Sequence, residues 1–538
     1  MMKPLPLQTA ALCSAIIALT STAGAQTNPP HVIPINPGGM ELELRTPPAP
    51  ATPRINGPDI FGVRPGNPFL YHIPATGDRP MTFSASDLPK GLKLDAATGN
   101  ITGSVADAGK YSVTFHAKNS KGTADKKFTI VVGAEIALTP PMGWNSWNAY
   151  HDTVTGENVM HAARAMVASG LIEHGFSYIN IDDSWQGKRG GEFNGIQANE
   201  KFPNIQQMCE EIHAMGLKAG IYSGPWITTY AGYVGGSADN PEGAWEKPPD
   251  RKRLHGKYSF ADNDAKQWAA WGFDYLKYDW NPRNSSPRET SEEFHKHSAA
   301  MGTALRKSKR DVVFSYSNSM PFDDIADESQ IYNCWRTTGD IGDSWMSMAA
   351  KAFYMNAPKG AKELEGAPSD RWAPYARPGH WNDPDMMVLG VVNFGGKQHP
   401  TRLTPNEQYL HVTAWCMAAA PLLLGCDLDK LDAFTMNLVS NDEVLAVDQD
   451  MLGKQATVAS NEGNTLLVYS RPLEDGSQAV ALYNIGHEPA KVTAKWADLK
   501  LSGEHSVRDL WRQKDLGKFA NEFSMTVAPH GAEMVKIK

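Results

Sequence analysis

Five separated acidic motifs, each placed after a short apolar run, carry the clearest chemical signal in this sequence. They are Asp182-Asp183, Asp279, Asp340, Asp383-Pro384-Asp385 and Asp427-Leu428-Asp429. Acids that follow buried strands cannot lie unpaired in a core. They fit the C-terminal rim of a parallel barrel, where strand ends converge on one cleft. Several carboxylates with tryptophans, and no metal-type cluster of His and Cys, favour a sugar-cleaving site.

Asp279 and Asp340 are the predicted catalytic pair. Asp279 ends a short apolar strand, and the period of two places Lys277 on the same side. A cation there can hold a neighbouring carboxylate ionised, although a structural Lys–Asp pair explains the spacing equally well. Two barrel units later come Asp340 and Asp343, and a retaining glycosidase needs a second carboxylate about 5–5.5 Å from the first. We favour Asp340, because Asp343 precedes a predicted helix and can serve as its cap.

Other polar and aromatic residues near these acids predict contacts with a sugar. Asp182 and Asp183 are adjacent and diverge, so each can accept a hydrogen bond from a different hydroxyl. Arg336, four residues before Asp340, can bind hydroxyl groups with its fork of donors. Three tryptophans are candidates for contact with the apolar face of a pyranose, although a core position explains any one of them equally well: Trp147, Trp185 and Trp381.

The elements that must position these residues alternate between strand and helix from about residue 137 to 450. The predicted strands are 142–147, 178–183, 218–223, 275–280, 312–317, 332–337, 386–390 and 421–426. The predicted helices include 157–169, 205–215, 262–271, 291–306, 344–354 and 405–418. About eight such units fit a (β/α)₈ barrel with insertions. Two long stretches rich in Gly, Pro and aromatic residues, 224–258 and 357–380, are expected to be functional loops.

The chain is expected to be multidomain, with β-sandwiches before and after the barrel, since short runs there alternate at period two. The N-terminal sandwich resembles the Ig-like or cadherin-like modules of bacterial secreted enzymes. A spacer or packing role and a sugar-binding role both remain open for it. The predicted domains are a signal peptide (1–25), a Pro-rich linker (26–57), an Ig-like sandwich (58–134), a catalytic barrel (135–452) and a C-terminal sandwich (453–538).

Composition and the first residues bear on partners and location. The net charge of −8 argues against nucleic acid or an anionic membrane as the main partner. An apolar stretch at 10–19 followed by Ala23-Gly24-Ala25 predicts a cleaved secretory signal, hence a secreted or periplasmic protein. Four cysteines follow it, too few for a disulfide scaffold, and buried thiols are the favoured interpretation, with one bridge left open. No cofactor and no metal ligands are predicted, and the oligomeric state is left open.

Seven motifs occur together and in a fixed order over residues 137–538. They are Pro140-Pro141-Met142-Gly143-Trp144-Asn145-Ser146-Trp147, Ile181-Asp182-Asp183-Ser184-Trp185, Gly220-Ile221-Tyr222-Ser223, Lys277-Tyr278-Asp279, Cys334-Trp335-Arg336-Thr337-Thr338-Gly339-Asp340-Ile341, Trp381-Asn382-Asp383-Pro384-Asp385-Met386 and Ala446-Val447-Asp448-Gln449-Asp450. This set resembles glycoside hydrolase family 27, the α-galactosidase and α-N-acetylgalactosaminidase family. The resemblance implies a barrel followed by an antiparallel domain, and a galactose-containing oligo- or polysaccharide as substrate.

The resemblance also implies a role for each matching residue. Asp279 falls at the family's nucleophile and Asp340 at its acid/base. The implied substrate-binding residues are Asp182 and Asp183 for the axial O4 and O6 of galactose, Trp147 as an aromatic wall, Lys277 and Arg336 near C2 to C4, Asp385 as a supporting acid, and Tyr222 within its motif.

Two departures from the family pattern affect specificity. Many members follow the nucleophile with Gly-Cys and bridge that Cys to the loop after the third strand. Here Trp280-Asn281 follows Asp279, and the stretch 224–258 contains no Cys. Where α-galactosidases often have Glu-Trp after the fifth strand, this sequence reads Ser317-Asn318-Ser319, which leaves room at the C2 substituent.

Several substrates therefore remain open beside α-galactose. The same fold can act on α-N-acetylgalactosamine, β-L-arabinopyranose or an isomaltose-type unit, and a non-catalytic carbohydrate-binding protein is the alternative of a different class. β-L-Arabinopyranose is galactose without C6, and a longer acid at position 183 would fill that space. Asp183 is short, so galactose is preferred.

Overall fold

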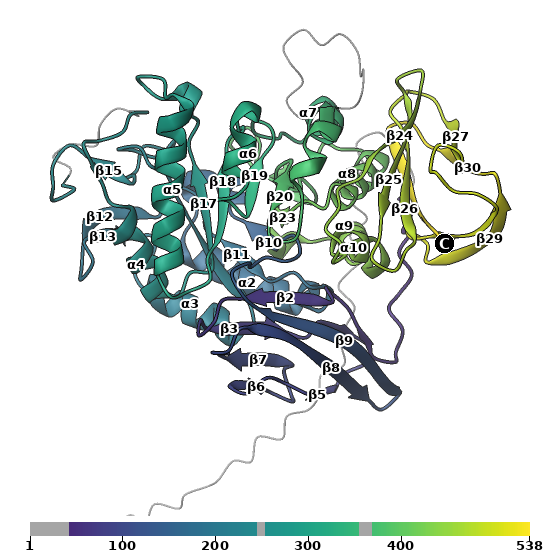
Figure 1. The fold of residues 1–538 in the computed structure, drawn as a ribbon, viewed down its shortest axis with the longest axis horizontal. Coiled ribbons are helices and arrows are strands. Elements are labelled where there is room, and N and C mark those ends of the chain that lie inside the picture. The colour runs from purple at the N-terminus through teal and green to yellow at the C-terminus, as the bar shows by residue number, and fades with distance from the viewer. Residues whose placement is uncertain (1–41, 245–252, 355–367) are drawn as a thin grey trace, which may run out of the picture. The chain divides into compact units, whose positions relative to one another are not determined.

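The computed structural model describes residues 42–244, 253–354 and 368–538. Within these ranges no helix combines the length and the apolar character needed to cross a membrane. The predicted signal peptide and the first half of the predicted linker lie outside the described residues, as do parts of the predicted loops 224–258 and 357–380. Figure 1 follows the chain by colour, from purple N-terminal strands through teal and green strands and helices to yellow C-terminal strands.

Eight parallel strands form the central sheet, as the sequence predicts. They are β10 (Met142–Asn145), β11 (Tyr178–Asn180), β14 (Lys218–Ser223), β17 (Tyr275–Asp279), β18 (Val313–Ser317), β19 (Cys334–Arg336), β20 (Trp381–Asp383) and β23 (Leu422–Leu424). Their order is β20-β19-β18-β17-β14-β11-β10-β23, and a parallel bridge between Met387 and Leu424 joins the chain after β20 to β23. Because the strands are parallel, their C-terminal ends share one rim, which confirms the predicted fold class.

The predicted seventh strand, 386–390, is wrong. The strand is β20, and the apolar run that follows it is buried without forming a ladder beyond the single bridge at Met387. The cause is a sharp turn between them, since Asp385 has a positive φ of 114°. An apolar run reports burial, and burial alone does not distinguish a strand from a buried turn.

The helices between the strands lie within about two residues of their predicted ends. They are α2 (Gly156–Ala168), α3 (Ile205–Ala214), α4 (Ala261–Trp271), α5 (Ser291–Lys307), α7 (Trp345–Tyr354) and α8 (Pro405–Met417). A capping box between Thr404 and Glu407, with Pro405 in the first turn, starts α8. The helix is buried on all sides, because it also packs against strands of the C-terminal domain. Shorter helices are α1 (Trp147–Tyr150), α6 (Ile325–Glu328), α9 (Ala433–Val439) and α10 (Asp442–Asp448).

The excursion after β14 is partly ordered by short antiparallel pairs. β15 (Ser237–Ala238) pairs with β16 (Tyr258–Ser259), and a bridge joins Thr228 to Val234. Comparable pairs in other rim loops are β12 (Gln186–Gly190) with β13 (Gly195–Ala198) and β21 (Val391–Val392) with β22 (His399–Pro400). The described part of the predicted loop 224–258 therefore contains short antiparallel pairs between its own residues.

The N-terminal module is a small β-sandwich of the Ig-like kind. Its four-stranded sheet has the order β2-β9-β8-β5 and its three-stranded sheet the order β3-β7-β6. The rings of Tyr71, Phe115 and Phe128 pack together in its core. Its strands are β1 (Arg54–Ile55), β2 (Ile60–Val63), β3 (Phe69–His72), β4 (Ala75–Thr76), β5 (Thr82–Ser86), β6 (Leu92–Leu94), β7 (Asn100–Gly103), β8 (Gly109–Asn119) and β9 (Gly122–Val132).

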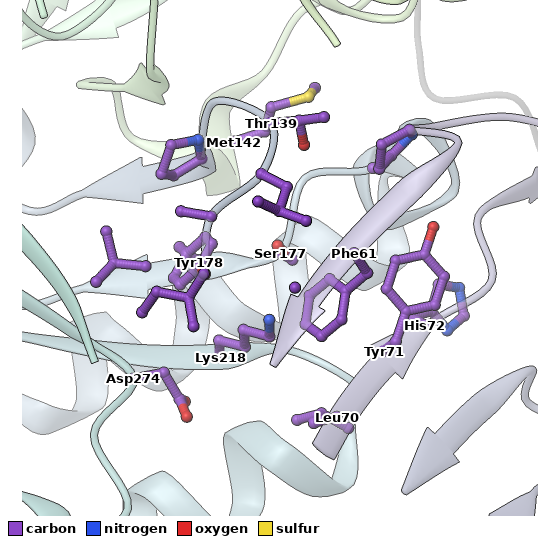
Figure 2. Close-up of a pocket in the computed structure, with 18 of the residues that line it drawn as sticks. Phe61, Leu70, Tyr71, His72, Thr139, Met142, Ser177, Tyr178, Lys218 and Asp274 are labelled. Carbon is purple, nitrogen blue, oxygen red and sulfur yellow. The ribbon is translucent and has the colours of Figure 1, made fainter. Parts of the chain in front are cut away.

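A cavity of about 120 Å³ lies where this module meets the N-terminal ends of the barrel strands (Figure 2). The Lys218 amine lies 4.3 Å from the centre of the Phe61 ring, next to Tyr178. Burial lowers the pKa of Lys218 to about 8. Asn67 fastens the module to the loop before β18 by donating to Asp311 at 2.7 Å. The cavity is at the opposite end of the strands from Asp279 and plays no part in the site below.

The C-terminal domain is antiparallel, as expected. A six-stranded sheet has the order β24-β25-β26-β31-β28-β29, and β27 pairs separately with β30. The strands are β24 (Thr457–Glu462), β25 (Leu466–Pro472), β26 (Gln478–Asn484), β27 (Ala490–Lys495), β28 (Glu504–Asp509), β29 (Lys514–Ala520), β30 (Glu522–Val527) and β31 (Gly531–Ile537). The alternating runs predict strands at 465–470, 478–484, 504–509, 524–527 and 533–537, which correspond to β25, β26, β28, β30 and β31. The pattern does not indicate β24 and β29, which lie at the two edges of the larger sheet and are largely exposed, or β27.

Candidate active site

The strand ends gather the predicted acids on one rim of the barrel. Asp279 is the last residue of β17, Arg336 ends β19 and Asp383 ends β20. Asp182 follows β11 by two residues. In the register of the sheet, Asp279 lies beside Ser317 of β18, and Arg336 lies beside Asp383. Parallel pairing therefore brings residues far apart in sequence to one rim of the barrel.

Asp279 is oriented by a hydrogen bond to each of its carboxylate oxygens. The Tyr222 hydroxyl donates to Oδ2 at 2.9 Å, and the Asn318 amide donates to Oδ1 at 2.8 Å. The residue is only 9% exposed. Burial raises the pKa of the Asp279 carboxyl above its usual range, while the Lys277 charge and the Asn318 hydrogen bond partly offset the effect. The group is thus held in one orientation with its charge only partly compensated.

Lys277 is paired with Asp182. Its Nζ lies 2.7 Å from Asp182 Oδ2, and the Asp182 side chain is almost fully buried. Burial lowers the pKa of Lys277, but the charges of Asp182 and Asp279 outweigh it and leave the pKa above its usual range. Lys277 therefore stays charged, with a direct bond to Asp182 and a longer-range attraction to Asp279.

Asp183 points away from Asp182 and into the excursion after β14. Its Oδ2 accepts a hydrogen bond from the Ala231 amide at 2.9 Å, and its Oδ1 accepts one from the Ser184 amide at 2.7 Å. Burial raises the pKa of Asp183 to about 7, although these bonds oppose the shift. The two adjacent carboxylates diverge as predicted, and the carboxyl of Asp183 is partly protonated near neutral pH.

Arg336 connects Asp340 to the supporting acid Asp385. Its Nη2 lies 2.6 Å from Asp385 Oδ2 and 3.4 Å from Asp340 Oδ1. The Asp340 side chain is 82% exposed, whereas Arg336 and Asp385 are buried. Partial desolvation raises the pKa of Asp340, but the charges of Arg336 and Lys277 outweigh it and hold the pKa below its usual range.

Asp385 occupies a backbone conformation that side chains rarely adopt. Its φ of 114° is held by its own amide, which donates to Asp383 Oδ1 at 2.8 Å, and by Trp415, whose indole donates to the Asp385 carbonyl at 2.6 Å. Its Oδ2 also accepts the Ile341 amide at 2.7 Å. Strain of this kind persists where the surroundings fix it, and such places cluster at functional sites. Here the turn brings the Asp385 carboxylate under Arg336.

The tryptophan predictions divide in two. Trp147 is half-buried, at the start of α1 just past the end of β10, and its ring packs edge-on against His151. Trp185 and Trp381 are fully buried, so their prediction as sugar-contacting residues is wrong. The Trp185 indole donates to the Tyr222 carbonyl, and that of Trp381 donates to the Ala137 carbonyl. Both rings can be buried in the core because each indole N–H has a backbone carbonyl as its hydrogen-bond acceptor.

Two further acids lie apart from this arrangement. Asp427 accepts a hydrogen bond from Tyr150 and pairs with Lys430. The Asp343 side chain is buried and pairs with Arg402, so it does not present a free carboxylate to the cleft. Among the described contacts, neither acid bonds to Asp279 or Asp340. The structure brings together four of the five acidic motifs.

Two contacts in the site were not foreseen from the sequence. The sequence indicates Asn318 only as a small residue near C2, whereas in the structure its side-chain amide donates to Asp279. Its positive φ of 69°, which Asn tolerates better than most residues, turns the side chain back toward β17. The contact of the Ala231 amide with Asp183 could not be predicted, because any residue has a backbone amide. The sequence signal nearest to it is the aromatic-rich stretch 224–258, which was expected to be a functional loop.

Family models cover most of the chain. The model for alpha galactosidase A matches residues 139–243 and 252–450, and the model for the alpha galactosidase C-terminal beta sandwich domain matches residues 463–537. The chain belongs to the alpha galactosidase A family. A third model, for an Ig domain, matches residues 52–133. This family membership makes the protein a glycoside hydrolase.

Individual relatives agree with this assignment. Alpha-galactosidase 2 of Arabidopsis thaliana is 38% identical over 405 residues, which cover 74% of this chain and 89% of the relative. The crystal structure of alpha-galactosidase I from Mortierella vinacea is 32% identical with a TM-score of 0.61, covering 74% of this chain and 97% of its own. A Bacteroides fragilis structure, provisionally assigned as an alpha-galactosidase, covers 93% of this chain and 99% of its own at 34% identity and a TM-score of 0.78.

A relative with another sugar also shares the fold. A β-L-arabinopyranosidase from Geobacillus stearothermophilus is 26% identical with a TM-score of 0.62, covering 75% of this chain and 97% of its own. The fold alone therefore does not decide between galactose and its analogue without C6.

Proposed function

We propose that this enzyme is a retaining exo-α-galactosidase that removes terminal α-linked D-galactose from oligo- or polysaccharides. Asp279 is the nucleophile and Asp340 the acid/base. The observation that carries the proposal is the pair of hydrogen bonds from Tyr222 and Asn318, which fix both oxygens of Asp279 at the strand end. A carboxylate held this way is ready to attack one carbon from one direction.

The reaction proceeds in two displacements. In the first, an Asp279 oxygen bonds to C1 of galactose while the bond from C1 to the leaving oxygen breaks, and Asp340 gives its proton to that oxygen. In the second, Asp340 takes a proton from water, the water oxygen bonds to C1, and the bond to Asp279 breaks. The configuration at C1 is inverted twice and so is retained.

The charges around the cleft suit this change of role. With Asp279 ionised, its charge repels that of Asp340 and opposes the lowering of the Asp340 pKa by Arg336 and Lys277, so Asp340 holds its proton more tightly before the ester forms than after it. Once Asp279 carries the sugar as a neutral ester, that repulsion disappears. Arg336 and Lys277 then favour the ionised form of Asp340, which is the base that the second step needs.

Substrate recognition is assigned to the residues around this pair. Asp182 and Asp183 accept from the O4 and O6 hydroxyls, Lys277 and Arg336 donate to hydroxyls at C2 to C4, and Trp147 contacts the apolar face. Tyr222 and Asp385 act by orienting Asp279 and Arg336 respectively. Asp183 is a short side chain and leaves room for C6, which favours galactose over β-L-arabinopyranose.

Residues 1–25 are proposed as a secretory signal, so the mature enzyme is proposed to act outside the cytoplasm. The domain boundaries that we propose for the chain are those predicted from its sequence. No cofactor enters the proposed reaction.

Asp279→Ala tests the proposal most simply. Hydrolysis of nitrophenyl α-galactoside should be abolished, and external azide should restore part of it with the product in the inverted, β configuration. Measuring the same panel with the α-N-acetylgalactosaminide and β-L-arabinopyranoside decides the substrate. Activity of Asp279→Ala close to that of the wild type would refute the assignment of the nucleophile.

A further inference from the structure

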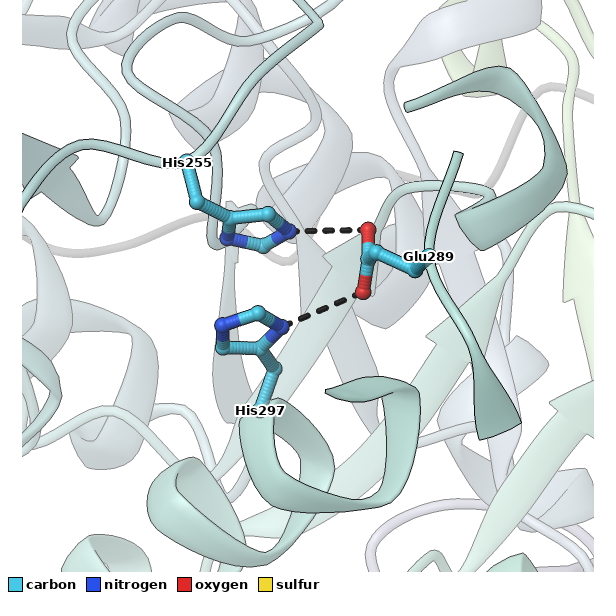
Figure 3. Close-up of side chains that lie close together, drawn as sticks. All are labelled: His255, Glu289 and His297. Atoms are coloured by element: carbon cyan, nitrogen blue, oxygen red, sulfur yellow. Dashed lines mark hydrogen bonds and ion pairs between the residues drawn. The ribbon is translucent and has the colours of Figure 1, made fainter. Parts of the chain in front are cut away.

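A cluster of two histidines and one glutamate lies outside the proposed active site. Glu289 precedes α5, His297 lies within α5, and His255 comes from the excursion after β14 (Figure 3). His255 Nε2 lies 2.8 Å from one oxygen of Glu289, and His297 Nδ1 lies 3.1 Å from the other. The two imidazole rings are stacked, with centres 3.6 Å apart and planes 12° from parallel. Three potential metal ligands thus face one another.

The charge of Glu289 is poorly compensated by the protein alone. Its side chain is only 4% exposed, and among the described residues its ion-pair partners are these two histidines, with no Lys or Arg. Two neutral imidazoles leave a buried carboxylate without a full counter-charge, and balancing it with a proton alone places one imidazolium directly against the other ring, whose centre is 3.6 Å away.

A single divalent cation resolves this imbalance, because it balances the carboxylate while both imidazoles stay neutral. We propose that His255, Glu289 and His297 bind a divalent transition-metal ion, with Zn²⁺ as the cation that suits two imidazole nitrogens and a carboxylate. Water completes the coordination.

The distances are compatible with this site. The three potential ligand atoms all lie within 4.8 Å of one another. Zn–N and Zn–O bonds of about 2.0–2.2 Å in a tetrahedron place neighbouring ligand atoms about 3.4 Å apart. The present His–Glu separations are hydrogen-bond lengths. When the cation takes the place of the two bridging protons, each neutral ring carries its one proton on the other ring nitrogen, and the rings tilt until their lone pairs converge.

A second layer of contacts holds the carboxylate in place. The Ser285 hydroxyl donates to Glu289 Oε1, and the Trp226 indole donates to the same hydroxyl at 2.9 Å. Hydrogen bonds to ligating groups of this kind are a regular feature of metal sites. His255 is held by its neighbours, since the Ile227 amide donates to the Leu254 carbonyl at 2.9 Å.

The consequence of the site is mechanical. The excursion that supplies His255 also supplies the Ala231 amide bonded to Asp183. The segment that supplies Ser285 and Glu289 begins directly after β17, which ends at Asp279. A cation held by His255 from one side and by Glu289 and His297 from the other therefore fastens the loop that contacts Asp183 to the segment that follows Asp279.

The test measures metal binding to the full-length protein with any affinity tag removed. Protein stripped with chelator is titrated with ZnCl₂ by calorimetry, and Zn²⁺ content after gel filtration is measured by mass spectrometry. The wild type should bind one equivalent, and its Tm should rise by a few degrees with Zn²⁺. Glu289→Gln and His297→Gln should bind at least about tenfold more weakly, since even outer-shell substitutions cost this much.

His295→Gln is the matched control. His295 lies on the same helix and bonds to Glu328, outside the cluster. It should bind Zn²⁺ like the wild type. Co²⁺ added to the wild type should also give the visible absorption of a tetrahedral ion, which needs no variant and so does not depend on how the variants fold. Absence of stoichiometric Zn²⁺ binding in the wild type, or equal binding in wild type and His297→Gln, would overturn the proposal.

Discussion

Removing the hydroxyl of Tyr222 should raise the pH at which the enzyme begins to work. Tyr222 donates to Asp279 Oδ2 at 2.9 Å, and both groups are buried. A hydrogen bond to a charged group contributes about 1.5–3 kcal/mol and one to a neutral group about 0.5–1.5 kcal/mol. The bond therefore favours the ionised carboxylate by about 1–1.5 kcal/mol, which corresponds to roughly one pKa unit.

The sign follows from the role of the group. Asp279 must be ionised to attack, and burial already raises its pKa. Tyr222→Phe removes a bond that stabilises the ionised form, so the pKa rises further. The acidic limb of the kcat/KM profile reports this ionisation in the free enzyme and should move up by about one pH unit.

The assay is the pH profile of kcat/KM on nitrophenyl α-galactoside for the wild type, Tyr222→Phe and a matched control. Tyr150→Phe is that control, because the Tyr150 hydroxyl donates to the carboxylate of Asp427 at 3.0 Å, away from Asp279. Its acidic limb should coincide with that of the wild type. An unmoved limb in Tyr222→Phe, or equal movement in both variants, would refute the reasoning.

Three other variants or substrates test separate parts of the site. Asp340→Ala should spare the first step on activated substrates and accumulate glycosyl-enzyme; an equal loss on activated and natural substrates, without a burst, would show that Asp340 is not the acid/base. Lys277→Met should destabilise the fold by about 3–5 kcal/mol, because Asp182 is left buried and unpaired; an unchanged Tm would contradict this. Hydrolysis of the α-galactoside should exceed that of the α-N-acetylgalactosaminide by at least about tenfold in kcat/KM, or about 1.4 kcal/mol, because empty space near C2 does not pair an acetamido group. Comparable kinetics on the two nitrophenyl glycosides would instead show that the site accepts the acetamido group.

The sequence predicts best those elements whose burial pattern is regular. β14 and β26 have their predicted bounds, because each is an uninterrupted apolar run ended by polar residues. The acids placed after such runs are found at the rim, since parallel pairing leaves one common end for them. The errors arise where burial and strand pairing separate, as in the apolar run after Asp385, which is buried without forming a strand.

The site was less predictable because much of it depends on backbone and on long-range contacts. The Ala231 amide that holds Asp183 has no residue signature, and the Asn318 amide reaches Asp279 only through its left-handed backbone. Trp185 and Trp381 are of the residue type that stacks on sugar rings, yet both are buried, and their indole N–H groups donate to backbone carbonyls in the core.

The metal-type cluster was missed for the same reason. Glu289 and His297 are close in sequence, but His255 arrives from another loop, and no ligand spacing that is typical of zinc connects the three. The four cysteines that the structure describes are buried and free, which agrees with the expected buried thiols.

The central claim is that Asp279 forms a covalent bond with galactose, and labelling tests it most directly. An activated 5-fluoro-α-D-galactosyl fluoride should be turned over slowly and trap the glycosyl-enzyme, and peptide mapping by mass spectrometry should locate one hexosyl label. We expect the label on the peptide that contains Tyr275–Asp279, on Asp279 itself. A label on Asp340 or another carboxylate, or turnover of the reagent without any covalent species and with inversion at C1, would contradict the account.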